Sequence, residues 1–529
     1  MTLNSAQTLD QLQQENARLL ALVEQQKSSI EILKHQLHLF RTARFGRKSE
    51  KNVVGEQYAF QFDEAYDVPK TSSTDATSAS STETITYTRA KKGTGRQPLP
   101  QSLPYVETIH DLKEEDKHCV CGCALTHIRD EVTEQLDVVP QMTFRVVHIR
   151  KQYACKGGEE TMRLAPMPKQ PITKSIATPG LLAAVINSKF NHHMPLYRQE
   201  AMFKTAGISV TRATLSHWLI KSSQLLLPLV KLLIADIQDY DIAYADETTL
   251  QVLKEKNRAP TQKSFMWLFL GGKPHKRAVV YQYHTTRSHS IARDFFADFK
   301  GYVHADCYQA YVNLGLQEAI KHVACWAHAR RYFVDVAKSQ KKAGLAQRFV
   351  ALIRQLYLIE QALKEIHALP DDVLKTRKKQ SKPVLLQIKA LLDDSQLKVP
   401  PKSPLGTALF YALTHWDSLN NFLLDGRLDI DNNLSERTIK PFVIGRKNWL
   451  FHGNELGATA ASILYSLIET CKQNKIDVFN WFKYTLTHIH QVQSLEQLEK
   501  LLPYNIDTHL LTDMRNLPEL IMTEKEGVN

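Results

Sequence analysis

The first forty residues carry the most regular alternation of apolar and polar positions in the chain. Apolar or amide side chains recur there at alternating spacings of three and four residues. This seam consists of Leu9, Leu12, Asn16, Leu19, Val23, Gln26, Ile30, Leu33, Leu37 and Phe40. With Leu9 at an a position of a heptad, Asn16 also falls at a, where a buried amide favours a parallel two-stranded register. The pattern predicts a coiled coil over residues 1–45 that pairs two copies of the chain. The alternative is one amphipathic helix packed on the protein's own core.

Hydrophobic periodicity stops after this segment. The basic stretch RTARFGRKSEK, residues 41–51, is either a solvated hinge or a contact for phosphates. Residues 71–88 are mostly serine and threonine with few large apolar side chains, a composition typical of a disordered linker. We therefore expect residues 46–100 to form a basic segment followed by a linker.

Helical spacing returns over residues 175–235. The stretch PLYRQEAMFKTAG is followed by a glycine turn at Gly207 and by a second, threonine-capped helix that contains TRATLSHWLIK. At 100° per residue, Leu215, Trp218 and Leu219 share one face of that helix. This pattern predicts a helix-turn-helix, although many helical hairpins bind nothing. A DNA-recognition helix here would present Arg212, Thr214, His217 and Lys221 to the major groove.

From residue 239 onward the pattern changes to short apolar runs. Three strands, two of them joined as a hairpin, are followed by an amphipathic helix, a fourth strand and a fifth strand that turns into a helix. Asp246 lies on the first strand and Asp306 at the end of the fourth. This order matches the ribonuclease H-like α/β fold, in which the first and fourth strands are neighbours. We therefore expect a catalytic core over residues 236–455 in which the two aspartates meet.

Two neighbouring aspartates repel each other, and a divalent cation is the usual relief. Glu436 is the candidate third ligand, on a short helix that Asp431 would cap and Pro441 would end. Three carboxylates of this kind predict a two-metal Mg²⁺ site for phosphoryl chemistry. The alternative for each acid is a surface charge or a helix cap. The basic residues expected to hold phosphates beside this site are Arg437, Lys440, Arg446 and Lys447.

The stretch between the fifth strand and Glu436 is too long for a loop. It is strongly helical, so we expect a helical insertion at about 340–425. Within the insertion, the basic run KTRKKQSK (375–382) either tracks DNA or solvates a loop. Cys325 and His328 have Cys-x₂-His spacing, but without a second pair they favour a structural role over a zinc site.

Composition favours a polyanionic partner. In 529 residues, 67 lysines and arginines outnumber 55 acidic residues, which gives a net charge of +12. Such a surplus favours nucleic acid. The start of the chain has neither the basic nor the apolar region of a signal peptide. The most apolar run, residues 225–237, is interrupted by Pro228 and Lys231 and reads as too short for a membrane span.

The seven cysteines do not suggest a disulfide framework, which fits a reducing compartment. Their crowding near residue 120, with another cysteine beyond, predicts instead a zinc-held hairpin module over residues 101–170. His118, His127 or His148 would complete the ligand set; the alternative is free structural thiols. The candidate zinc ligands are Cys119, Cys121, Cys123 and Cys155.

Nearly the whole chain resembles transposases of the bacterial insertion sequence 66 family. The motifs include FGRKSEK, HMPLYRQE, TLSHWL, ADET, HADCYQAY, CWAHARR and DGRLDIDNNLSERTIKPFVIGRKNWLFHGNELGA. The resemblance implies a cytoplasmic DDE transposase whose triad is Asp246, Asp306 and Glu436, with a small C-terminal helical domain over residues 456–529. It also implies Mg²⁺-dependent hydrolysis at transposon ends, strand transfer into target DNA, and accessory proteins of the same element. The chain departs from the family pattern at Tyr105, usually arginine, and at Gly158, usually a cysteine, which bears on zinc binding.

Two other functions share much of this pattern. A metal-dependent nuclease that cleaves without strand transfer would need the same three carboxylates but no pairing of DNA ends. A catalytically silent DNA-binding protein descended from a transposase would keep the helix-turn-helix, and the intact set of carboxylates argues against it.

Overall fold

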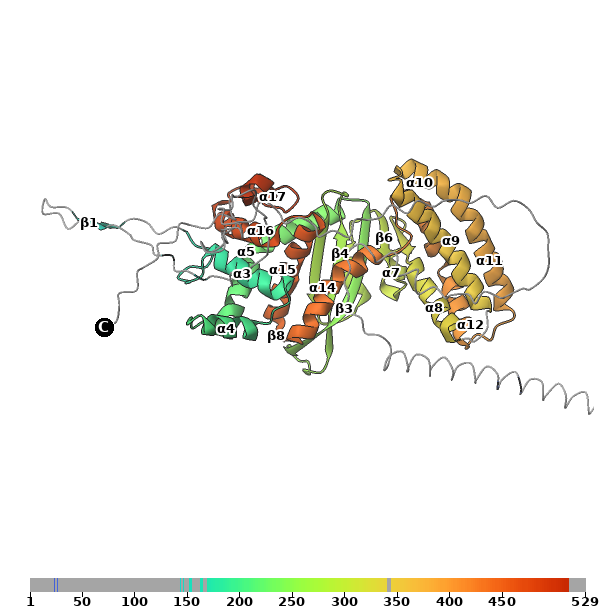
Figure 1. Ribbon diagram of the computed structural model, residues 1–529, viewed down its shortest axis with the longest axis horizontal. Coiled ribbons are helices and arrows are strands. Elements are labelled where there is room, and N and C mark those ends of the chain that lie inside the picture. The colour runs from blue at the N-terminus through green and yellow to red at the C-terminus, as the bar shows by residue number, and fades with distance from the viewer. Residues whose placement is uncertain are drawn as a thin grey trace, which may run out of the picture. The chain divides into compact units, whose positions relative to one another are not determined.

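The computed structural model describes residues 169–339 and 344–512, two short strands, and the single residues Val23, Gln26, Thr143 and Val146 (Figure 1). The two strands, β1 (Gln152–Ala154) and β2 (Met162–Leu164), pair antiparallel and belong to a separate compact unit, residues 69–165. Most of the predicted coiled coil, the linker and the four candidate zinc ligands Cys119, Cys121, Cys123 and Cys155 lie outside the described residues.

A mixed sheet forms the centre of the larger unit. Its strands are β3 (Ile242–Lys254), β4 (Lys263–Gly271), β5 (Ala278–His284), β6 (Gly301–Ala305) and β7 (Ile320–Ala324). They are ordered β5-β4-β3-β6-β7, and β8 (His452–Asn454) pairs with the far end of β3. The first three strands are antiparallel, whereas β3, β6 and β7 run parallel. The predicted succession of strands and helices is confirmed in this part of the chain.

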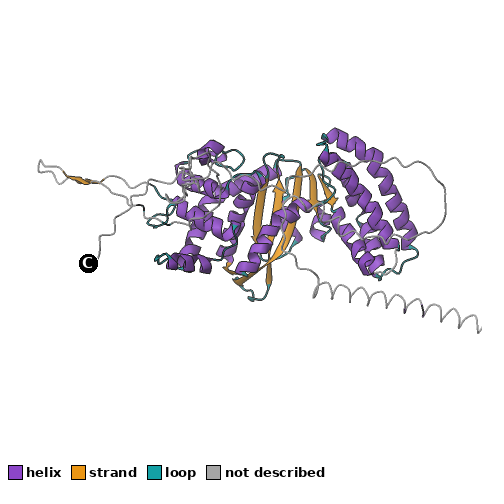
Figure 2. Cartoon of the chain, viewed as in Figure 1, coloured by secondary structure: helices purple, strands orange, loops and turns teal. Residues whose placement is uncertain are grey.

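Helices cover both faces of this sheet (Figure 2). On one face, Tyr281 of β5 packs against Phe442 and Tyr465. These two rings belong to α14 (Asn433–Trp449) and α15 (Glu455–Gln473). On the other face, Phe269 of β4 stacks on Phe295, which belongs to α6 (His289–Phe295), and Trp267 meets Tyr311 of α7 (Gln309–Leu314). The aromatic residues of neighbouring strands thus separate into two layers of core.

The two predicted helices and the glycine turn between them are present. After α3 (Pro179–Ile186) and a π-helix, η2 (Asn187–Asn191), come α4 (Leu196–Thr205) and α5 (Arg212–Gln238). Gly207 adopts a φ of +74° in the turn, a value that glycine reaches without strain. Thr211 then caps α5 by accepting a hydrogen bond from the Thr214 backbone N–H. As predicted, Leu215, Trp218 and Leu219 are buried.

The expected interruption of the apolar run at Pro228 was wrong. Pro228 lies inside α5, which is 27 residues long in total. By length and composition alone, this helix could cross a membrane. Leu226, Leu229 and Leu233 are fully buried in the protein core. The burial of these leucines stabilises α5 around Pro228, where the proline removes one backbone hydrogen bond.

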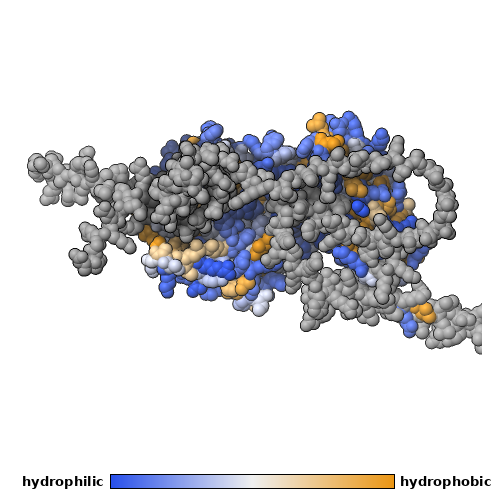
Figure 3. Space-filling view, in the orientation of Figure 1, coloured by the Kyte–Doolittle hydropathy of each residue, from blue (hydrophilic) through white to orange (hydrophobic). Residues whose placement is uncertain are grey.

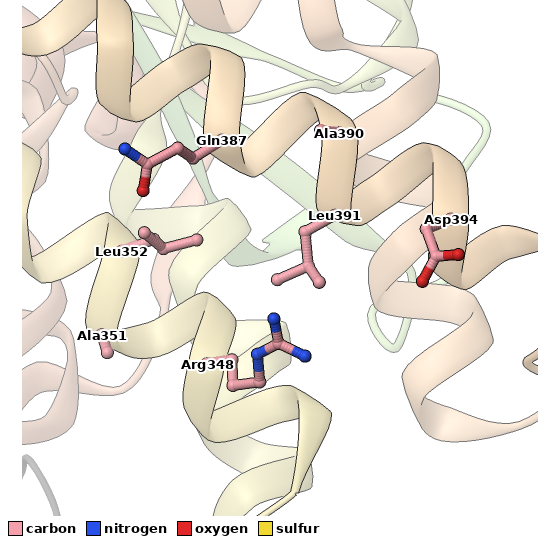
Figure 4. A pocket seen from close by; sticks show the side chains of 7 residues that line it. All are labelled: Arg348, Ala351, Leu352, Gln387, Ala390, Leu391 and Asp394. Atoms are coloured by element: carbon pink, nitrogen blue, oxygen red, sulfur yellow. The ribbon is translucent and has the colours of Figure 1, made fainter.

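The insertion between α8 (Trp326–Ser339) and α14 is helical, as predicted. It contains α9 (Leu345–Glu365), α10 (Pro370–Thr376), η3 (Arg377–Ser381), α11 (Lys382–Gln396), α12 (Pro404–Thr414), α13 (Trp416–Asn420) and η4 (Asn421–Leu423). A groove of about 560 Å³ lies between α9 and α11 (Figure 4). It is lined by Arg348, Ala351, Leu352, Gln387, Ala390, Leu391 and Asp394, so none of the candidate carboxylates borders it.

The basic run at residues 375–382 was predicted either to track DNA or to solvate a loop, and both predictions were wrong for Arg377. The run is helical, and Arg377 is only 2% exposed. Its guanidinium forms a two-pronged ion pair with Glu360 and donates to the carbonyl oxygens of Phe422, Asp425 and Leu428. All five N–H groups of the guanidinium are thereby used. Arg377 therefore ties α9 to the segment that leads toward Glu436, while Lys375, Lys378, Lys379 and Lys382 stay exposed.

The two ends of the insertion are joined to each other. The Trp326 backbone N–H donates to the carbonyl of Ile430 (3.2 Å), and its indole N–H donates to the carbonyl of Leu419 (2.7 Å). The Asn421 side chain donates to the carbonyl of His322 on β7 (2.7 Å). The chain therefore leaves the sheet and returns to it at the same place.

After β8 the chain is helical again. α15 packs along β5, and it is followed by α16 (Val478–His488), η5 (Ile489–Gln491), α17 (Leu495–Glu499) and α18 (Thr508–Thr512). Most buried apolar side chains of these helices belong to the same continuous core as the sheet. The described surface in view in Figure 3 is largely hydrophilic, with scattered hydrophobic spots.

Candidate functional site

The register of two parallel strands brings Asp246 and Asp306 to the same place. Tyr244 of β3 is aligned with His304 of β6, and their rings stack with centroids 4.5 Å apart. Asp246 and Asp306 each follow this pair by two residues. Because side chains alternate between faces along a strand, both aspartates lie on the face that carries the stacked rings. Two residues far apart in the chain thus become neighbours at one end of the sheet.

This location is electrostatically unfavourable for carboxylates. Burial raises the pKa of Asp246 well above its usual range, and the negative charges of Glu247, Asp306 and Glu436 raise it further. The Glu247 backbone N–H donates to Asp246 Oδ1 (2.8 Å), and the Tyr308 N–H donates to Asp306 Oδ1 (2.9 Å). Those N–H groups orient the carboxylates without neutralising them. The repulsion between the acids is therefore available to favour a bound cation.

Glu436 lies in the first turn of α14, and its Oε1 is buried without a hydrogen-bond partner. The nearest cationic groups are farther away than a hydrogen bond. His328 Nε2 is 3.6 Å and Arg331 Nη2 is 4.0 Å from this oxygen. An orphaned, buried carboxylate oxygen is costly, so it indicates a ligand that completes the site.

The predicted boundaries of the Glu436 helix were wrong. Pro441 does not end α14, which continues to Trp449 because Phe442 and Trp449 are buried on its far turns. Asp431 does not cap it either, because the cap position is held by Asn432. Asp431 instead accepts hydrogen bonds from the backbone and the side chain of Asn433. The helix tolerates Pro441 because side chains buried before and after it stabilise one continuous helix.

Asn432 was missed by sequence reasoning. Its side chain donates to the carbonyl of Ala245 (3.1 Å), the residue directly before Asp246, and its backbone N–H donates to Cys325 Sγ (3.2 Å). It thereby holds the start of α14 against the middle of β3. The only signal in the sequence is a pair of asparagines ahead of a helix, which is also the pattern of an ordinary cap.

The other acids of the same segment already have partners. Asp429 accepts a hydrogen bond from Tyr244 Oη (2.7 Å) and pairs with Lys364 Nζ (3.2 Å). Burial raises the pKa of Asp431 to about 6, and the charge of Asp429 adds to this. Glu436 is thus better suited than Asp429 to bind a further ligand.

The three carboxylates do not form the tightest group of ligand atoms. Among the described residues, ligand atoms of Cys325, His328 and Glu436 lie within 4.8 Å of one another, a group that omits both aspartates. The carboxylate of Glu436 is therefore turned toward α8. Cys325 is fully buried, and His328 is partly buried on the first turn of α8.

The four basic residues of α14 differ in their surroundings. Arg446 is partly buried and donates to Thr248 Oγ1 (3.1 Å) and Thr249 Oγ1 (3.3 Å), whereas Lys440 and Lys447 are exposed. At about 100° per residue, these two lysines lie within roughly 40° of Glu436 around the helix. Arg437 is partly buried and already interacts with another group of the protein. The exposed lysines thus share a face of α14 with the carboxylate.

The four residues predicted on the recognition helix are found at the start of α5. Arg212 is exposed and paired with Glu200 (2.9 Å), and Thr214 is partly buried beside Thr211. His217 and Lys221 are exposed. The last two therefore offer accessible side chains on this helix.

Sequence comparison decides the family. The profile described as Transposase IS66 family matches residues 174–460, a range that contains the sheet, the insertion and all three carboxylates. The chain belongs to the IS66 transposase family. Further profiles of the family match residues 466–504 (IS66 C-terminal element), 116–157 (zinc-finger binding domain of transposase IS66) and 32–108 (Transposase C of IS166 homeodomain).

Similar curated proteins come from Sinorhizobium fredii (strain NBRC 101917 / NGR234). The uncharacterized protein y4jD is 34% identical over 77% of this chain and 81% of its own length. The uncharacterized protein y4qI is 30% identical over 93% of this chain and 92% of its own length. The likeness between this chain and these relatives thus extends beyond the sheet, while the names of the relatives state no activity.

Proposed function

We propose that this chain is a DDE-type DNA transposase. It binds the terminal inverted repeats of its insertion sequence, hydrolyses a phosphodiester at each end, and transfers the freed 3′ ends to target DNA in the cytoplasm. The observation that carries the proposal is that Asp246 on β3 and Asp306, directly after the adjacent parallel strand β6, lie beside the helix of Glu436 in a member of a transposase family. The strand order supports the ribonuclease H-like core expected for such enzymes.

The carboxylates fit a magnesium site. They are oxygen ligands, the pKa of Asp246 is raised by burial and further by the neighbouring acids, and Glu436 has a buried oxygen without a hydrogen-bond partner. Bound at such a site, two Mg²⁺ ions lower the pKa of the attacking water or 3′-OH and stabilise the leaving oxygen. We assign Asp246 and Asp306 to hold both ions and Glu436 to complete one of them. The zinc-finger profile supports Zn²⁺ in the module that contains Cys119, Cys121, Cys123 and Cys155.

Other residues position the DNA. Lys440 and Lys447 lie on the Glu436 face of α14, where their ammonium groups attract phosphates near the scissile bond. His217 and Lys221 face outward from α5, where they contact the repeats. We assign pairing of two transposon ends to a dimer through residues 1–45, together with any accessory proteins of the element.

The test is a cleavage and strand-transfer assay on inverted-repeat DNA, run beside gel-shift binding. Asp246→Asn, Asp306→Asn and Glu436→Gln each remove a ligand charge with little change of shape. Each is expected to abolish cleavage and to leave binding of the ends intact or tighter, because a charge that repels phosphates is lost. Asp294→Asn, at an exposed surface acid, is the matched control and should cleave normally.

Three results would contradict parts of the proposal. Cleavage by Glu436→Gln near the parent rate would remove Glu436 from the site. Cleavage without strand transfer by the parent would favour the nuclease. Binding of the ends without any Mg²⁺-dependent chemistry would favour a silent DNA-binding protein.

A further inference from the structure

The group formed by Cys325, His328 and Glu436 has a geometry that the proposed magnesium chemistry does not explain. Their ligand atoms lie within 4.8 Å of one another. The distance of 3.6 Å from His328 Nε2 to Glu436 Oε1 is too long for a hydrogen bond. It is close to the separation of about 3.3 Å expected for two ligands bound at 2.0–2.1 Å to one tetrahedral ion.

Two of these side chains also have unmet bonding capacity. Glu436 Oε1 and His328 Nδ1 are buried, and neither has a hydrogen-bond partner. A bound ion would satisfy Glu436 Oε1 and one imidazole nitrogen of His328. The unpartnered atoms come from two different elements, α8 and α14, that meet at this point.

Two features beside Cys325 would support its thiolate once a metal ion is bound. Cys325 directly precedes α8, whose N-terminus favours negative charge. Its sulfur accepts a hydrogen bond from the Asn432 backbone N–H (3.2 Å), an interaction that supports a metal-bound thiolate. Burial raises the pKa of the free thiol, so an incoming ion must displace the thiol proton into solvent.

From this geometry we propose that Cys325, His328 and Glu436 form a second metal site, selective for a borderline-soft ion such as Zn²⁺ or Co²⁺. A thiolate, an imidazole and a carboxylate are the three protein ligands, and water takes the fourth position. Mg²⁺ is excluded by its preference for oxygen ligands. Both this site and the proposed magnesium site use Glu436, so an ion bound at one site makes Glu436 unavailable to an ion at the other. That competition rests on the proposed function, whereas binding of the ion does not.

Cobalt binding tests the site directly. The probe is Co²⁺ added to metal-free full-length protein in which Cys119, Cys121 and Cys123 are serine, so that the zinc-finger module contributes little thiolate signal. One equivalent should bind and produce a thiolate-to-cobalt charge-transfer band in the near ultraviolet. Cys325→Ser should abolish the band. His328→Asn and Glu436→Gln should weaken binding at least about tenfold.

Two controls make the result decisive. Cys307→Ser removes a half-buried thiol outside the group and should leave the band unchanged. Because His328 keeps 24% of its side chain exposed, His328→Asn tests the site even if Cys325→Ser fails to fold. Absence of the band in the parent, or its survival in both Cys325→Ser and His328→Asn, would overturn the proposal.

A second measurement separates this site from the transposase proposal. Zn²⁺ should inhibit Mg²⁺-dependent cleavage, and inhibition should require at least about tenfold more Zn²⁺ in His328→Asn, each rate normalised to its own zinc-free value. Equal inhibition of both proteins would overturn the shared use of Glu436. A protein that binds Co²⁺ through these residues but never cleaves DNA would retain the metal site and lose the transposase function.

Discussion

Arg377→Ala is expected to destabilise the helical insertion much more than Lys378→Ala, although both residues belong to one basic run. Arg377 is 2% exposed and uses all five guanidinium N–H groups, two of them on Glu360. Its removal leaves Glu360 charged and buried without its partner, which costs about 3–5 kcal/mol. Lys378 is exposed, so its replacement should change the free energy of unfolding by less than about 0.5 kcal/mol.

Urea denaturation followed by tryptophan fluorescence provides the assay. Trp326 and Trp416 contact each other edge to face beside the insertion, so their emission reports its unfolding. Arg377→Ala should shift the midpoint to lower urea without changing the slope. The pair Arg377→Met with Glu360→Leu should cost less than the sum of the single changes, because it removes both charges together.

Two outcomes would refute this reasoning. If Arg377→Ala unfolds within about 0.5 kcal/mol of Lys378→Ala, the buried ion pair does not hold the insertion in place. If the double replacement costs the full sum of the single ones, Glu360 and Arg377 act independently.

Three further predictions concern assembly, DNA and pH. Deleting residues 1–41 should halve the mass measured by light scattering, and an unchanged dimer would place the contact elsewhere. Lys447→Ala should lower the salt slope of DNA binding by about one, and Arg446→Ala should do so only if Arg446 leaves its two threonine partners. Because the pKa of Asp431 is raised to about 6, its carboxylate should destabilise the fold progressively as pH rises from about 4 through 6. Asp431→Asn should therefore raise the melting temperature at pH 7 more than at pH 4, and an equal effect at both would contradict the shift.

Local patterns were sufficient to predict the sheet. The runs that hold Asp246 and Asp306 are apolar and bounded by turns, and the match of the order of elements to the ribonuclease H-like fold predicted that their strands are neighbours. The spacing of the apolar residues along α5 likewise identified its buried face. These features depend on side chains close in sequence, where periodicity carries the information.

Contacts between distant segments could not be predicted in this way. Arg377 looks like its lysine neighbours in the sequence, and only the three carbonyls and the glutamate brought to it by folding distinguish it. Pro441 is an ordinary helix breaker until the burial of Phe442 and Trp449 is known. The orientation of Glu436 toward His328 depends on how α8 and α14 meet, and no spacing in the sequence encodes that meeting.

The joined ends of the helical insertion have a consequence for how such chains change over time. Because Trp326 is hydrogen-bonded to Ile430 and Asn421 to His322, the two ends of the insertion are held next to each other at the sheet. The loops between the helices of the insertion can lengthen or shorten at a small cost in entropy, since the cost rises only with the logarithm of loop length. The spacing in sequence between Asp306 and Glu436 is thus free to drift among relatives while the two carboxylates keep their places in space.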